Sequence, residues 1–111
     1  MGSGVRVIVL GISQDGGFPQ AGCNQDCCDS VKNNPKLTKH PVSIGIVGSD
    51  GTRHLIEATR DLAWQLNLFN SIKSNKNLLS SLWITHAHHG HIDGLGLFGK
   101  EVMNYNKLNV N

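Results

Sequence analysis

A histidine-rich turn is the part of this sequence that most constrains how the chain can fold. Residues 82–85 form an apolar run that predicts a strand, and residues 85–91, Thr-His-Ala-His-His-Gly-His, hold four of the chain's six histidines. Apolar residues at helical spacing then predict a second long helix over about 92–105. The turn after the carboxyl end of a strand is where α/β sheets collect their ligands. The segment therefore favours an α/β domain over a helical bundle.

The rest of the chain supplies the other elements of such a domain. Short β-branched runs predict three further strands, over residues 5–12, 42–47 and 53–58. A helix is expected from Thr59, a good N-cap residue, to about Phe69. Residues 13–39 show no clear periodicity, and residues 108–111 resemble the beginning of another strand. A loop as long as 13–39 in a compact domain is either functional or disordered.

Length and charge exclude several classes of protein. The 111 residues suit one domain, and no run approaches the eighteen apolar residues of a membrane span. No two basic residues are adjacent and the net charge is +2, which gives no footprint for nucleic acid or a membrane surface. Residues 1–4 resemble a flexible leader, and no secretory signal follows them. We expect a cytoplasmic protein without nucleic-acid or membrane partners.

The histidines themselves predict a metal site. His86 and His88 lie two apart in an extended segment, so their imidazoles project to the same side and can bind one Zn²⁺, with Fe or Mn as alternatives. His91 can reach a neighbouring position as the chain enters the helix. The alternative is a polar turn with several solvated imidazoles. So many histidines behind an apolar strand favour a metal site, or the remnant of one.

The cysteines form a second candidate group. Cys23, Cys27 and Cys28 lie within six positions, which without a secretion signal favours thiols or metal ligands over disulfides. Thiolates at this spacing suit a structural Zn²⁺, which needs four ligands. Adjacent Cys27 and Cys28 are both expected to bind only if the backbone bends sharply between them. The fourth ligand is either His40 or a residue outside this chain, and the alternative is free thiols in a flexible loop.

Three other polar features are ambiguous. The Asp15-Gly16-Gly17 segment can bring backbone close to a ligand, but an ordinary tight turn after a strand is the simpler interpretation. Glu57 follows a strand and can face the metal, although an isolated carboxylate is more often a surface or helix-terminal charge. His54 is expected to be exposed.

Residues 82–95 resemble the T-H-x-H-x-D-H-x-x-G-L signature of the metallo-β-lactamase superfamily. Together with residues 15–19, the cysteines and residues 55–59, they resemble the branch that contains the pyrroloquinoline quinone biosynthesis protein B. The resemblance implies that His86 and His88 bind a first metal and His91 a second. Gly90 stands where the family has the aspartate of the second metal. His89 and Asp93 are possible substitutes, both out of register.

The resemblance also implies a fold and a function. The expected fold is half of an αβ/βα sandwich, a mixed sheet with two main helices, as one truncated domain over residues 5–111. An exposed sheet face would favour a homo-oligomer. The implied activity is metal-dependent hydrolysis or cofactor biosynthesis on an unknown small molecule, completed by missing sequence or a partner chain. The alternatives are a non-catalytic amino-terminal fragment and a small zinc-stabilised interaction module.

Overall fold

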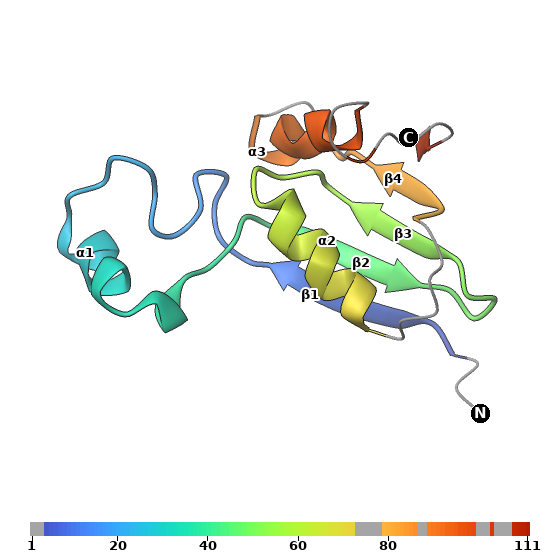
Figure 1. Ribbon diagram of the computed structural model, residues 1–111, viewed down its shortest axis with the longest axis horizontal. Coiled ribbons are helices and arrows are strands. Elements are labelled where there is room, and N and C mark those ends of the chain that lie inside the picture. Colours follow the sequence, from blue (N-terminus) through green and yellow to red (C-terminus); the bar gives the residue numbers. More distant parts are fainter. Residues whose placement is uncertain (1–3, 73–78, 87–88, 100–102, 104–107) are drawn as a thin grey trace.

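The fold is built on one mixed β-sheet, seen in the computed structural model in Figure 1, which describes residues 4–72, 79–86, 89–99, 103 and 108–111. Its five strands lie side by side in chain order: β1 (Arg6–Gly11), β2 (Ser43–Val47), β3 (Arg53–Ile56), β4 (Ser81–Trp83) and β5 (Asn109–Val110). β1, β2 and β3 pair antiparallel, whereas β3, β4 and β5 pair parallel. The α/β class, the mixed sheet and the strand near the end of the chain are as the sequence predicts.

Helix α2 (Leu62–Ser71) covers one face of the sheet (Figure 1) and forms the core with it. Leu62 and Phe69 on this helix have no exposed surface, and neither have Leu55 and Leu82 on the strands beneath. Gly45 of β2 lets the helix approach closely, because a Cβ atom there would lie 2.6 Å from the ring of Phe69. The helix that the sequence predicts after Thr59 is confirmed.

The opposite face of the sheet is apolar and exposed. Val7 and Val9 of β1 are more than three-fifths exposed, and Trp83 of β4 is about half exposed. Self-association through an exposed face of the sheet, which the sequence led us to expect, stays a prediction. Among the described residues, no helix has both the length and the apolarity needed to cross a membrane.

The prediction of a second long helix over residues 92–105 is wrong for the part of that range that the structure describes. The segment instead forms a four-residue helix, α3 (His89–Ile92), and then a 3₁₀ turn, η2 (Asp93–Phe98). Glycines at 94, 96 and 99 weaken an α-helix, because glycine loses more conformational freedom than other residues on folding. Gly94 also packs so closely that a Cβ there would lie 2.2 Å from the carbonyl oxygen of Thr59.

The long segment between β1 and β2 extends from the sheet as an arm (Figure 1), which we define as residues 13–39. It is not structureless, since it contains α1 (Asp26–Asn33) and a 3₁₀ turn, η1 (Pro35–Leu37). Its two ends are joined where Phe18 and Lys39 exchange backbone hydrogen bonds of 3.0 and 2.8 Å. Helix α1 was missed because it is short and buries only two residues, too few to produce an apolar period.

Candidate metal centre

The histidine loop and two other loops meet at one edge of the sheet. β1 and β3 each pair antiparallel with β2, and β4 pairs parallel with β3, so all three strands run in the same direction. The carboxyl ends of β1, β3 and β4 therefore share an edge, as in sheets that bind ligands there. Asp15 follows β1, Glu57 follows β3, and His86 follows β4.

Glu57 is the buried centre of this edge, with only 3% of its surface exposed. Its carboxylate accepts hydrogen bonds of 2.8 Å from both the backbone amide and the hydroxyl of Thr85. The same carboxylate contacts Nδ1 of His91. These partners offset the cost of burying a charge. The interpretation of Glu57 as a surface or helix-terminal charge is wrong. That interpretation considered only the neighbours of Glu57 in the sequence, whereas its partners Thr85 and His91 lie about thirty residues away along the chain.

Glu57 also sets which nitrogen of each histidine faces outward. Because the ionised carboxylate accepts the hydroxyl proton of Thr85, that hydroxyl accepts its 2.9 Å hydrogen bond from Nδ1 of His86. Nδ1 of His91, beside the carboxylate, carries a proton for the same reason. Each imidazole is then left with a lone pair on Nε2, the atom that can bind a metal.

The resulting donor set fits a metal ion. Ligand atoms of Glu57, His86 and His91 all lie within 4.8 Å of one another, and the two imidazole rings are 4.1 Å apart between centroids. Both oxygens of Glu57 are already engaged with Thr85, so we assign this carboxylate to positioning the histidines. Imidazole nitrogens suit Zn²⁺ and other first-row metals.

Some of the predicted ligands are not in this group. His88 lies outside the described residues, as does the side chain of His89, so their roles stay predictions. Asp93 instead accepts a hydrogen bond of 3.1 Å from Arg60. His54 is half-buried rather than exposed, and its Nδ1 lies 2.5 Å from the hydroxyl of Ser81.

Gly90 contributes no side chain to the histidine group, but Asp15 fills the space beside it. A Cβ atom on Gly90 would lie 2.2 Å from Cβ and 2.7 Å from Cα of Asp15. Oδ1 of Asp15 lies 3.1 Å from Nε2 of His91. For residues 15–17 the sequence predicted either a backbone approach to a ligand or an ordinary tight turn, and no role for the Asp15 side chain. The one signal that could have pointed to Asp15 was the missing aspartate at position 90.

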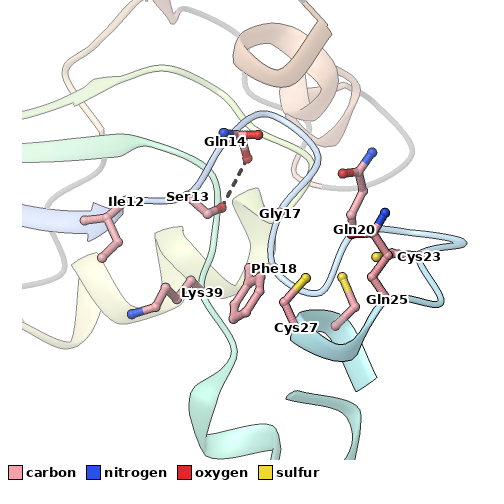
Figure 2. Close-up of a pocket in the computed structure, with 11 residues that line it drawn as sticks. Ile12, Ser13, Gln14, Gly17, Phe18, Gln20, Cys23, Gln25, Cys27 and Lys39 are labelled. Atoms are coloured by element: carbon pink, nitrogen blue, oxygen red, sulfur yellow. Dashed lines mark hydrogen bonds between the residues drawn. The ribbon is translucent and has the colours of Figure 1, made fainter. Parts of the chain in front are cut away.

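The three cysteines also come together, on the arm. Their Sγ atoms lie within 4.8 Å of one another, and they line a pocket of about 490 Å³ (Figure 2). Cys27 and Cys28 lie in the first turn of α1, so both thiols reach the group from a helix and not through a sharp bend between them. His40, the proposed fourth ligand, has its Nδ1 2.8 Å from Asp61 and stacks on Trp64.

Structural neighbours share this architecture. Zn²⁺-bound PqqB from Methylobacterium extorquens superimposes with a TM-score of 0.71 at 20% identity, over 86% of this chain and 34% of that one. YhfI from Bacillus subtilis, a protein of the metallo-β-lactamase fold, superimposes with a TM-score of 0.57 at 21% identity, over 96% of this chain and 35% of that one. This chain has the metallo-β-lactamase fold.

A third protein of similar structure, a diphosphatase of the PhnP family, gives a TM-score of 0.70 at 25% identity, over 96% of this chain and 40% of that one. The metallo-β-lactamase fold thus covers nearly all of this chain, whereas the chain spans two-fifths or less of each solved relative. No protein-family model matches the sequence.

Curated relatives match in sequence over part of their length. An octanoyltransferase of Porphyromonas gingivalis is 34% identical over 91 residues, which are 82% of this chain and 17% of that protein. The coenzyme PQQ synthesis protein B of Rhodopseudomonas palustris is 36% identical over 62 residues, which are 56% of this chain and 20% of that protein. The similarity to the PQQ synthesis branch agrees with the motifs of the sequence.

Proposed function

We propose that this chain is a metal-binding part of a metallo-β-lactamase-like hydrolase, related to the PQQ synthesis branch. One observation carries the proposal: at the ligand-binding edge of the sheet, the Glu57–Thr85 pair engages Nδ1 of both His86 and His91, which makes Nε2 the metal-binding atom of each imidazole. The Zn²⁺ in the similar PqqB structure supports zinc as the ion. The PQQ relationship is supported by the 62-residue match to a coenzyme PQQ synthesis protein.

The chemistry follows from the donor set. A metal bound here would polarise a substrate oxygen or lower the pKa of a bound water. The chain's own residues would hold the ion through His86 and His91, with His88 as the further predicted ligand. Because the chain spans two-fifths or less of its solved relatives, we propose that catalysis requires further polypeptide, either continuous sequence or a partner.

The cysteine cluster supports a second candidate function, a zinc-stabilised interaction module. Cys23, Cys27 and Cys28 converge on an arm that extends from the sheet, where a bound ion would order a surface away from the histidines (Figure 1). Three thiolates need one more ligand to close a tetrahedral structural site. In this alternative the histidine group would bind no metal, which separates the two functions.

Cobalt binding tests the proposed function. We expect the chain to bind Co²⁺ at the histidine site, seen as visible bands without the thiolate charge-transfer absorption of the cysteine site. His86→Ala should weaken that binding at least tenfold, since even an outer-shell change costs roughly 10- to 100-fold. His54→Gln, a histidine change on β3, is the control and should bind as the parent does. Equal binding by His86→Ala and the parent would refute the proposal.

A further inference from the structure

Asp15 and Gly90 come from distant parts of the chain and fit each other sterically. The backbone Cα of Asp15 lies 2.7 Å from where a Cβ of residue 90 would be, so any larger residue at 90 would displace the loop that carries Asp15. That loop is held in place by a turn, in which Gly17 donates a 2.8 Å hydrogen bond to the carbonyl of Gln14. Gly17 has a φ of 80°, which favours glycine. The two positions thus leave room for one carboxylate.

The surroundings of His91 indicate what that carboxylate does. Nδ1 of His91 contacts Glu57, and Nε2 lies 3.1 Å from Oδ1 of Asp15. A carboxylate oxygen only accepts hydrogen bonds, so a neutral imidazole with its proton on Nδ1 would direct its Nε2 lone pair at another electron-rich atom. A cation between Nε2 and Oδ1 removes this conflict: either a second proton or a metal ion.

Distance and exposure are both compatible with the metal. Two ligand atoms about 2.0–2.1 Å from a tetrahedral Zn²⁺ lie about 3.3 Å from each other, close to the observed separation. The His91 side chain is 14% exposed while that of Asp15 is 49% exposed, so the pair opens to solvent on the Asp15 side. His86 has a ligand nitrogen in the neighbouring group with Glu57 and His91. A metal ion can therefore reach this position from solvent.

We propose that Asp15 is a metal ligand, and that it supplies from the loop after β1 the carboxylate that Gly90 cannot supply from the histidine loop. This inference rests on the proposed function and adds a ligand to the same site. Asp15 and His91 then hold one ion between them. Glu57 has a different role, since it positions His91 from the other side of the ring.

Substitution of Asp15 tests the assignment by metal affinity. In Co²⁺ titrations, Asp15→Asn should bind at least about tenfold more weakly at the histidine site, because a lost ligand costs no less than an outer-shell partner. Asp29→Asn, which removes an exposed carboxylate on α1, is the matched control and should bind as the parent does. If Asp15→Asn keeps the parent's affinity while His86→Ala loses it, the assignment of Asp15 is wrong and the proposed function stands.

Nitrogen NMR separates the metal from a simple ion pair. In the Zn²⁺-loaded chain, Nε2 of His91 should carry no proton. A His91 that stays protonated on both nitrogens at saturating Zn²⁺ would overturn the metal-ligand assignment. A parent chain that binds no metal at the histidines would refute both this inference and the proposed function.

Discussion

The two candidate metal groups differ in what holds them together. The histidine group lies at the edge of the sheet, where Glu57 is 3% exposed and fixes the histidines through hydrogen bonds made inside the protein. The cysteine group lies on the arm, where Cys27 is exposed and α1 buries only two residues. We infer that the first group is ordered before metal binds, whereas the second depends on its ion for order.

The largest expected effect comes from removing the support of the histidine group. Glu57→Ala should lower the free energy of unfolding by about 3 kcal/mol, because it leaves the amide and hydroxyl of Thr85 without their acceptor and breaks the buried contact with His91. It should also abolish Co²⁺ binding at the histidines. Urea denaturation and cobalt titration measure the two losses.

The cysteine site provides the control for that variant. Its thiolate–cobalt absorption should persist in Glu57→Ala at concentrations of denaturant where the chain is still folded. Loss of both signals in a folded protein would mean that the two groups are not independent.

Metal removal should have a smaller and more local effect. Chelation of the ion at the cysteine site, or Cys27→Ser, should raise the rate of amide hydrogen exchange in α1 and leave the rates in β2 and β3 almost unchanged. The reason is that few buried contacts hold the arm to the sheet. The expected loss of protection in α1 is roughly tenfold, about 1.4 kcal/mol. Ser30→Ala, a change on the same helix away from the thiols, is the control. Equal exchange of α1 with and without metal would show that the arm needs no ion.

The hairpin between β2 and β3 provides a reference that involves neither group. Asp50 there accepts hydrogen bonds from the hydroxyl of Thr52 at 2.7 Å and from its amide at 3.1 Å, and these hold the pKa of the carboxyl below its usual value. A carboxyl whose pKa is lower in the folded chain stabilises the fold at pH values above its pKa in the unfolded chain. This stabilisation is lost as the pH falls through its pKa in the folded chain.

Asp50→Ala should therefore lower the urea midpoint slightly at neutral pH, and the difference from the parent should disappear as the pH falls below the lowered pKa of Asp50. The effect should be the smallest of the three, because the group is fully exposed. Ser49→Ala controls for a change in the turn itself. A difference that grows as the pH falls would contradict the assigned sign.

Local sequence predicted the elements that depend on near neighbours. The strand over 42–47 is observed as β2 at Ser43–Val47, and the helix over 59–69 is observed as α2 at Leu62–Ser71. β-Branched alternation and helical spacing are properties of a few consecutive residues, so they are readable in one dimension. The helix expected over 92–105 failed because apolar spacing was counted and the glycines within it were not.

Residue types and their order along the chain were sufficient to predict the α/β class, the histidine-rich turn after a strand, and the group of three thiols. The residues that complete the histidine group follow instead from how the strands are arranged in space. Glu57 and Asp15 gain their partners because β1, β3 and β4 run in the same direction, which brings their carboxyl-terminal loops to one edge. Contacts between residues 15 and 90 depend on that topology, and no local propensity encodes them.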